Sequence, residues 1–213
     1  MTPCPRSTRI RRGTRGVDEP REGTGDGARG TGRLSEDVVH DGRIVRLSLD
    51  RVRFPDGSEG TLEMIRHRGA AAVLPVRGDL DDPDPEVLLL RQYRYAADGF
   101  IYEVPAGIRD PEDSTWEACA ARELEEETGF RAQHFRPLSR IYTTPGFTDE
   151  VIHLFLAWGL VAGTGDRDPD EFIEVVPMPL SEAVAMVDRG EIVDGKSICT
   201  LLLAHRFLFG GPA

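Results

Sequence analysis

The chain has 213 residues, 39% of them hydrophobic, and a net charge of −11 because 37 Asp and Glu outnumber 26 Lys and Arg. This size and apolar content predict one domain with room for a small appendage, and the acidic balance argues against nucleic acid or an anionic membrane as a partner. The sequence lacks the ~20 consecutive apolar residues of a membrane span and the apolar core of a signal peptide. Its three cysteines form neither a disulfide framework nor a zinc spacing, so we expect a cytoplasmic protein.

Two segments precede the main domain. Residues 1–33 contain eight Arg and seven Gly but almost no large apolar side chain, so they cannot offset chain entropy by burial and are predicted to be a disordered tail. Residues 34–68 show the alternation of short strands around the turn residues Pro55-Asp56-Gly57. They predict a small antiparallel sheet, which needs another surface to pack on.

Residues 69–213 have the pattern of a larger α/β domain. Short apolar runs at 70–76 and 87–90 predict strands that are covered on both faces. Further strands are predicted over 138–142 and 151–158, and further helices over 181–189 and 197–209. Together with a central helix, this mixed order predicts a sheet sandwiched between helices.

The central helix has recognisable ends. Ser114 and Glu117 have the S-x-x-E spacing of a capping box, so the helix is expected to start at Thr115. It should end at Gly129, where the missing Cβ suits a left-handed residue. At about 100° per residue, its buried stripe consists of Trp116, Cys119, Ala120 and Leu124.

Three glutamates of this helix, Glu123, Glu126 and Glu127, lie within or beside the buried stripe. Buried carboxylates without a positive partner are costly, so a cation is expected among them. Side chains at i, i+3 and i+4 converge, and a few carboxylates completed by waters describe a Mg²⁺ site that also takes substrate phosphates. The alternative is a solvated acidic face whose glutamates pair with Lys or Arg.

The residues around these glutamates resemble the signature of the Nudix hydrolases. Residues 122–130 read R-E-L-E-E-E-T-G-F and match its ending, R-E-U-x-E-E-x-G-U with U apolar, at every specified position. Residues 103–107 read E-V-P-A-G and resemble the E-x-P-A-G of the ADP-ribose pyrophosphatase branch. The segment between the two motifs is one residue longer than in the family, and the glutamate expected there is replaced by Asp113 or Ser114.

The resemblance covers about residues 38–207 and implies the Nudix fold, an α/β/α sandwich with a mixed sheet, here preceded by the small antiparallel sheet. It implies a metal site formed by the backbone carbonyl of Ala106 and the carboxylates of Glu123, Glu126 and Glu127. Mg²⁺ is the implied ion, with Mn²⁺ as a substitute, and it would polarise the phosphorus under attack. Arg122 would orient the glutamates by charge-assisted hydrogen bonds, and we count Arg122 and Glu126 among the catalytic residues.

A substrate arginine is implied by residues 91–94, which resemble the R-Q-Y-R of the ADP-ribose branch. In that branch the second arginine reaches the substrate, and a guanidinium suits a diphosphate, so Arg94 is the expected ligand. Glu103 is expected near the metal or the substrate. The alternative is that Arg94 is a surface arginine paired with an acid of the signature.

Residues 144–150 resemble the P-G-x-S-D-E loop of the same branch. Its distance from Gly129 is, in the family, the one that goes with ADP-ribose rather than with dinucleoside polyphosphates. Proline and glycine also make ordinary turns, which is the alternative. Phe147 of this loop is either a residue that stacks on adenine or a core residue.

The general base of the family comes from a mobile loop well after the signature. Here Gly163-Thr164-Gly165 would supply hinges, and Asp168, Asp170 and Glu171 supply carboxylates. Glu171 is our choice, because residues 172–175 look like the strand that follows the catalytic loop in the family. A solvated acidic loop is the alternative for each of the three.

Together these inferences predict a Mg²⁺-dependent Nudix hydrolase that cleaves ADP-ribose to AMP and ribose 5-phosphate. The alternatives are a pyrophosphatase for an ADP-sugar, GDP-mannose or NADH, a non-catalytic Nudix-like nucleotide sensor, and an acidic scaffold that binds divalent ions. The complete R-E-x-x-E-E group disfavours the sensor, and the E-x-P-A-G and R-Q-Y-R motifs disfavour the scaffold. The resemblance also implies a homodimer whose N-terminal sheet crosses onto the partner subunit.

Overall fold

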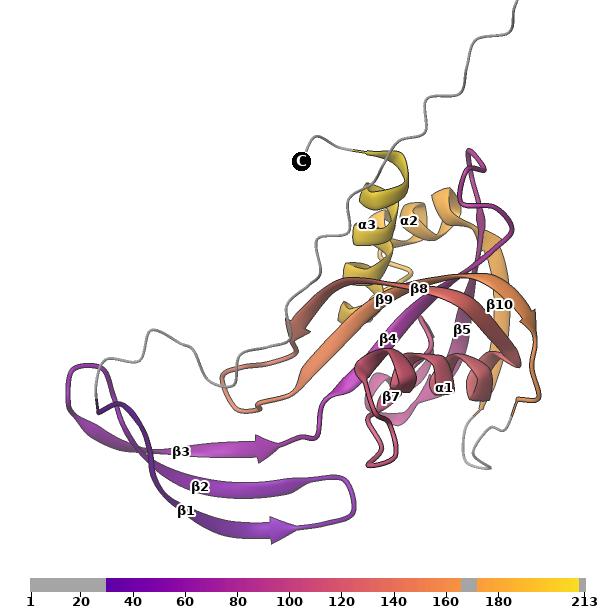
Figure 1. Ribbon diagram of the computed structural model, residues 1–213. Coiled ribbons are helices and arrows are strands. Elements are labelled where there is room, and N and C mark those ends of the chain that lie inside the picture. Colours follow the sequence, from indigo (N-terminus) through magenta and orange to yellow (C-terminus); the bar gives the residue numbers. More distant parts are fainter. Residues whose placement is uncertain (1–29, 166–171, 211–213) are drawn as a thin grey trace, which may run out of the picture.

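The computed structural model describes residues 30–165 and 172–210 (Figure 1). In this part of the chain, a three-stranded sheet is followed by a seven-stranded sheet with helices on both faces. The predicted α/β/α sandwich with a preceding antiparallel sheet is therefore confirmed. None of the helices in the described ranges is long and apolar enough to cross a membrane.

The N-terminal sheet has the strand order β1-β2-β3 and is antiparallel. Its strands are β1 (Gly32–Asp41), β2 (Arg46–Arg53) and β3 (Glu59–Arg66). It lies to one side of the larger sheet (Figure 1), and almost all of β1 is exposed. The predicted boundary of the tail at residue 33 is too far along the chain, because Gly32 and Arg33 already pair with β2. No sign of this is visible in the sequence, since backbone pairing needs no apolar side chains. Residues 1–29 of that tail lie outside the described residues.

The larger sheet has the order β10-β5-β4-β9-β8, with β6 paired to β5 and β7 paired to β4. Its strands are β4 (Ala70–Arg77), β5 (Glu86–Arg94), β6 (Gly99–Glu103), β7 (Ala106–Ile108), β8 (Phe130–Tyr142), β9 (Val151–Ala162) and β10 (Ile173–Pro179). A short 3-10 helix, η1 (Tyr95–Ala97), joins β5 to β6. The sheet is mixed, because β4 and β9 are parallel and the other pairs are antiparallel.

The strands differ from the prediction in two ways: two short strands were missed, and one strand begins earlier than predicted. The sequence analysis missed β6 and β7, which have 5 and 3 residues and are too short to give a periodic signal. β8 begins at Phe130, directly after the central helix, and not at residue 138. Polar residues dominate its first half, so apolar alternation did not reveal it.

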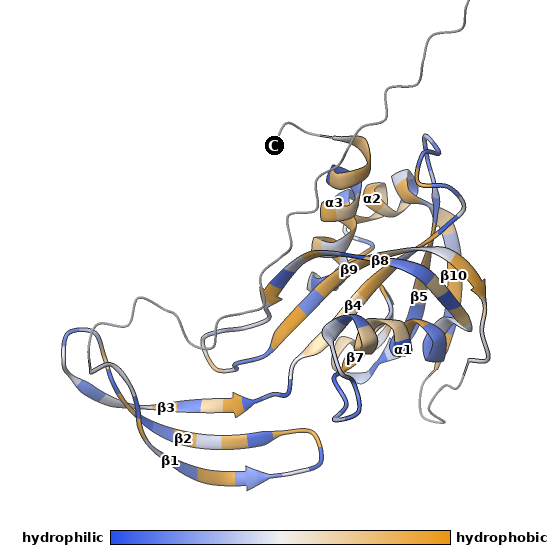
Figure 2. Cartoon of the chain, viewed as in Figure 1, coloured by the Kyte–Doolittle hydropathy of each residue, from blue (hydrophilic) through white to orange (hydrophobic). Residues whose placement is uncertain are grey.

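Helices cover the two faces of the larger sheet (Figure 1). α1 (Trp116–Thr128) lies on one face, and α2 (Leu180–Asp188) and α3 (Gly195–Phe209) lie on the other. Hydrophobic residues are concentrated on β4, α2 and α3 (Figure 2). Every residue from Ala70 to Val76 is buried, as predicted for a strand covered on both faces.

Both ends of α1 have local causes. Thr115, and not Ser114, caps the helix, because its Oγ1 accepts a 3.0 Å hydrogen bond from the N–H of Ala118. Gly129 ends the helix at a φ of 75°, in the predicted left-handed conformation. Three residues of the predicted stripe, Cys119, Ala120 and Leu124, are fully buried against β4 and β9.

Candidate active site

Arg122 joins the acidic residues of α1 into one cluster. Its Nη1 donates a 2.8 Å hydrogen bond to Glu123 and another of 2.8 Å to Glu126. Its Nη2 donates to Asp113 at 3.0 Å and to the carbonyl of Ile108 at 3.0 Å. Burial alone would lower the pKa of this guanidinium, but Asp113 and Glu123 outweigh it and raise the pKa above its ordinary value. Arg122 therefore has the contacts that the predicted orienting role requires.

Asp113, and not Ser114, occupies the position that the resemblance left open. The Asp113 carboxylate is buried, and it accepts hydrogen bonds from Arg122 and from the N–H of Asp110 at 2.9 Å. Burial would raise the pKa of Asp113, but the hydrogen bond from Arg122 reverses this and the net pKa is lowered. Asp113 is thus an ionised partner that holds Arg122 from the side opposite Glu126.

Glu123 and Glu127 face the segment that precedes α1, with exposed fractions of 8% and 3%. The N–H of Ala106 donates a 2.9 Å hydrogen bond to Oε2 of Glu127. At Gly107 a Cβ would overlap the carboxylate of Glu123, so only glycine lets the backbone come this close. β7 and α1 thus bring two buried carboxylates and the Ala106 backbone together.

This donor set fits a hard divalent cation. Carboxylate and carbonyl oxygens are the ligands that Mg²⁺ and Mn²⁺ prefer, and the missing Cβ of Gly107 lets the Glu123 carboxylate lie against the backbone next to Ala106. Within the described ranges, no three His, Cys, Asp or Glu side chains are grouped as metal ligands. The positive charge between Glu123 and Glu126 is Arg122 itself. The alternative to a metal site is a solvated acidic face whose glutamates pair with Lys or Arg. The pairing of Glu123 and Glu126 with Arg122 agrees with that part of the alternative.

The predicted substrate residues, Arg94 and Glu103, form an ion pair, and Lys196 binds the same Glu103 carboxylate. Nε of Arg94 donates a 2.7 Å hydrogen bond to Oε2 of Glu103, and Nζ of Lys196 lies 2.5 Å from Oε1 of the same carboxylate. The Arg94 side chain is 42% exposed and that of Glu103 only 4%. Arg94 pairs with the acid of the E-x-P-A-G motif and not with an acid of the signature. Our sequence analysis missed Lys196, although it is the only lysine in the chain.

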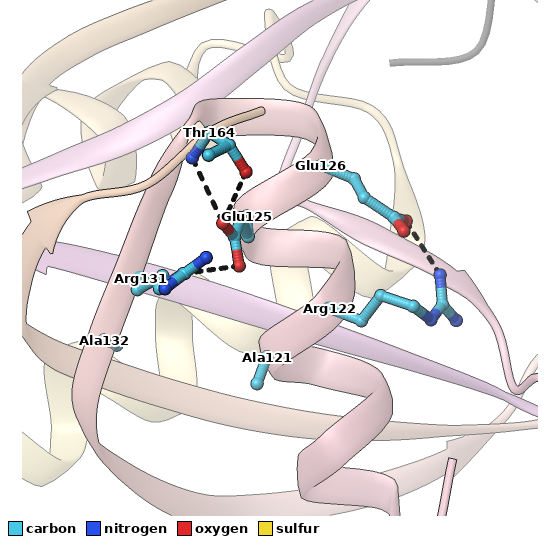
Figure 3. A pocket seen from close by; sticks show the side chains of 7 residues that line it. All are labelled: Ala121, Arg122, Glu125, Glu126, Arg131, Ala132 and Thr164. Carbon is cyan, nitrogen blue, oxygen red and sulfur yellow. Dashed lines mark hydrogen bonds and ion pairs between the residues drawn. The ribbon is translucent and has the colours of Figure 1, made fainter. Parts of the chain in front are cut away.

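A pocket of about 460 Å³ opens on the side of α1 that faces β8 (Figure 3). Its charged lining consists of Arg122, Glu125, Glu126 and Arg131, beside Thr164. Glu125 accepts hydrogen bonds of 2.7 Å from Arg131 and 3.0 Å from Thr164 Oγ1, which with the Thr164 N–H lower its pKa to about 2. The pocket shares Arg122 and Glu126 with the acidic cluster, and Glu125 ties the predicted hinge to α1.

The loop at 144–150 is held by the end of β3. The N–H of Ile65 donates to the carbonyl of Phe147 at 2.7 Å, and Asp149 accepts hydrogen bonds from the His67 N–H at 2.8 Å and from Arg66 at 3.1 Å. Phe147 is 51% exposed, so the interpretation as a core residue is wrong. An aromatic ring on the surface of this loop is compatible with stacking on a base.

The predicted general base, Glu171, and its alternatives Asp168 and Asp170 lie outside the described residues. Phe172, the next residue along the chain, lies within the described range, and its carbonyl accepts a 3.2 Å hydrogen bond from the N–H of Tyr93. β10 begins at the next residue, Ile173, which lies opposite Gln92 of β5.

Comparison with known proteins identifies the family. A sequence profile described as NUDIX domain matches residues 66–201. The chain belongs to the NUDIX family. The recognition of the family from the sequence is therefore confirmed.

Individual Nudix relatives match most of the chain. The ADP-ribose pyrophosphatase of Bacillus subtilis (strain 168) is 34% identical over 166 residues, which are 77% of this chain and 86% of that protein. The GDP-mannose pyrophosphatase of Cronobacter sakazakii (strain ATCC BAA-894) is 37% identical over 165 residues, which are 70% of this chain and 82% of that protein. A crystal structure of an ADP compounds hydrolase has a TM-score of 0.71 at 21% identity, covering 84% of this chain and 94% of that one. This similarity shows the Nudix fold.

Proposed function

We propose that this Nudix hydrolase cleaves the diphosphate of ADP-ribose to AMP and ribose 5-phosphate, with Mg²⁺ as its cation and Mn²⁺ as a substitute. The observation that carries the proposal is the cluster in which Arg122 binds Glu123 and Glu126 while Glu127 lies against the Ala106 N–H. The 34% identity to the ADP-ribose pyrophosphatase of Bacillus subtilis supports the substrate class.

Each residue of the cluster has a role in this proposal. The cation would be held by the carbonyl of Ala106 and by the carboxylates of Glu123, Glu126 and Glu127. When bound, it supplies Lewis-acid charge that stabilises the developing charge on the phosphate oxygens. Arg122 fixes Glu123 and Glu126, which removes the cost of organising them during the reaction.

Arg94 and Glu171 complete the proposed chemistry. Arg94 presents an exposed guanidinium to the diphosphate, for which its planar fork of donors is suited. Glu171 accepts the proton of the attacking water, as a carboxylate within hydrogen-bond reach would. The hydrogen bond between Phe172 and Tyr93 supports this choice, because Phe172 follows Glu171 and Tyr93 precedes Arg94 in the chain.

We further propose a cytoplasmic homodimer that covers the N-terminal sheet. This sheet exposes several large apolar side chains: Leu34, Val38, Val39, Ile44 and Val45. Several exposed apolar side chains on one small sheet and its β1–β2 turn are a feature of interaction surfaces. A second copy of the chain, joined by a two-fold axis, would bury them. The net charge of −11 disfavours a nucleic acid or an anionic membrane as a partner, and it means that a small anionic substrate needs local cations such as Arg94.

A second candidate is hydrolysis of GDP-mannose, because the Cronobacter sakazakii enzyme is 37% identical to this chain, although over a smaller share of it than the Bacillus subtilis enzyme. The two functions share the acidic cluster and differ only in the recognition of base and sugar. The described cluster does not distinguish them, because it contacts the diphosphate in both cases.

The test is a substrate panel. The protein is incubated with Mg²⁺ and ADP-ribose, ADP-glucose, GDP-mannose, NADH or diadenosine tetraphosphate, and both products are identified by ion-exchange chromatography and mass spectrometry. We expect AMP and ribose 5-phosphate at the highest kcat/KM. Higher kcat/KM with GDP-mannose would support the second candidate, and no hydrolysis with either Mg²⁺ or Mn²⁺ would refute both.

A further inference from the structure

A charge cluster around the buried Glu103 includes the proposed substrate arginine. It consists of Arg94, Glu103, Asp194 and Lys196, with two charges of each sign. Glu103 has one cation on each of its oxygens, Arg94 at 2.7 Å and Lys196 at 2.5 Å. Lys196 also lies 3.0 Å from Asp194. Two cations thus compete for one carboxylate that is almost completely buried.

Lys196 is the fixed cation of the cluster. Its side chain is 12% exposed, and its second partner, Asp194, caps α3 by accepting the Ser197 N–H at 3.0 Å. The hydroxyl of Ser197 accepts a 2.8 Å hydrogen bond from the N–H of Val104, the residue after Glu103. The amino end of α3 is therefore joined to the segment that carries Glu103, and Lys196 has little freedom to leave.

Arg94 is the releasable cation. Its side chain is 42% exposed, and in the part of the chain that the structure describes its only side-chain hydrogen bond is the one to Glu103. It lies at the last position of β5, where the strand ends in η1. A rotation of this side chain toward solvent would break one ion pair without disturbing the sheet.

The electrostatic difficulty lies in Glu103. If Arg94 turned to a diphosphate and no other cation were present, Glu103 would be left as a buried, unpaired charge. Removing one partner of a buried pair is strongly unfavourable for this reason. Lys196 would remove the difficulty, because it lies on the oxygen of Glu103 that Arg94 does not bind.

We propose that Lys196 is a positioning residue that neutralises Glu103 while Arg94 moves from Glu103 to the diphosphate of the substrate. The proposal rests on the proposed function, since it needs a diphosphate ligand. The proposal explains how Arg94 can be bound to Glu103 in this structure and still act as a substrate ligand. It also gives a physical reason for the one lysine among 26 basic residues: a compact ammonium can serve two carboxylates that approach from different directions.

The kinetic test uses Lys196→Met, which keeps an unbranched side chain of similar length up to Cε and removes the ammonium group. Without Lys196, Arg94 is the only cation left on Glu103, so KM for ADP-ribose should rise about 10- to 100-fold, the equivalent of one charged hydrogen bond, while kcat changes little. The matched control is Arg189→Met, which removes an exposed cation from the carboxylates of Glu182 and Glu191 and should change neither constant. A wild-type KM in an active Lys196→Met protein would overturn the proposal.

A double variant tests whether the two cations act through one contact. Arg94→Met should raise KM by itself, and adding Lys196→Met should then raise it no further, because residues that act as a unit are not additive. If the KM increases of the two single variants multiplied in the double variant, Arg94 and Lys196 would have independent roles, and the proposal would be overturned. Failure of the proposed function would look different, since the wild-type protein would then hydrolyse GDP-mannose better than ADP-ribose, or would hydrolyse nothing in the panel.

A spectroscopic test needs no activity and no change at Lys196. Protein labelled with ¹³C-lysine gives a single lysine side-chain signal, because the chain has one lysine. ADP without metal serves as an uncleaved diphosphate. We expect the Lys196 signal to shift on saturation of the wild-type protein and to stay in place in saturated Arg94→Met. No shift in the wild type, or an equal shift in Arg94→Met, would overturn the exchange, and the latter would show direct contact of Lys196 with the ligand.

Discussion

Gly107 lies directly against the carboxylate of Glu123, with no space between them for a side chain. The atoms that a Cβ would meet are at the far end of a flexible side chain and not in the backbone, so Gly107→Ala should fold but displace Glu123. We expect turnover to fall about 10- to 100-fold, as for other changes to the support of a metal ligand. Steady-state kinetics and thermal denaturation of the same samples would separate this effect from unfolding.

The control for this variant is Gly99→Ala, because a Cβ at Gly99 meets nothing within 4 Å. It should leave kcat and KM unchanged. Equal activity of Gly107→Ala and Gly99→Ala would mean that the position of Glu123 is not critical.

Glu127→Gln tests the proposed cation site. Gln keeps an oxygen that can accept the 2.9 Å hydrogen bond from the Ala106 N–H, but it removes the charge. Metal binding and turnover should therefore fall together, by about 10²-fold or more, while the fold survives. Glu117→Gln, an exposed change in the first turn of the same helix, is the control. Calorimetry with Mg²⁺ and rate measurements check this, and retention of more than about a tenth of the activity would contradict the assignment.

Glu171→Gln tests the proposed general base. It should lower kcat about 10²- to 10⁴-fold with little change in KM or metal affinity, because a proton acceptor acts in the transition state. The matched variants are Asp168→Asn and Asp170→Asn, measured over the same pH range. If one of these reproduces the loss and Glu171→Gln does not, the base lies in the acidic segment but at another residue.

His153 should make the protein sensitive to mild acid. Its pKa is lowered from 6.5 to about 4, first by burial and then by the charges of Arg140 and Arg109. Between these pH values the unfolded chain binds a proton that the folded protein does not, so the free energy of unfolding should decrease as the pH falls from 6.5 toward 4. The expected loss from this one group between pH 7 and pH 5 is about 2 kcal/mol.

The test of His153 is urea denaturation of wild type and His153→Phe at both pH values. Phe keeps an aromatic ring on Trp116, against which His153 stacks at 4.2 Å, and removes the titration. The variant should lose less stability than the wild type on acidification, whereas the exposed His40→Phe should behave as the wild type. Equal losses in all three proteins would exclude His153 as the cause.

Val39→Lys tests the proposed homodimer. Val39 is 57% exposed on β1, so a charge there should disrupt a partner interface without unfolding the chain. Light scattering should then show monomers at micromolar concentration, with activity reduced if the partner's sheet contributes to the site. Val161→Lys, at a 44% exposed position of β9, is the control.

Truncations complete the test of assembly. Deleting residues 1–29 should leave the dimer and the activity intact, and deleting through Ile65 should abolish both, although the whole Nudix signature remains. A wild-type protein that is monomeric, or an active monomer without the N-terminal sheet, would refute the dimer.

The sequence alone determined the features whose cause is local. The end of α1 at Gly129 follows from the conformational freedom of one residue, and the burial of Glu123 and Glu127 follows from their place in the helical period. The signature was readable because its residues are contiguous on one helix. The same reasoning missed β6 and β7, which are too short to carry a period.

Only the tertiary structure decided which residues meet across the chain. It selected Asp113 over Ser114 as the partner of Arg122, and it brought Lys196 onto Glu103 although 93 positions separate them. An ion pair between distant residues leaves no periodicity in either local sequence, because it depends on how α3 is placed against β6. The single lysine was visible from the start, but its role became apparent only when folding placed it beside a buried carboxylate that Arg94 also binds.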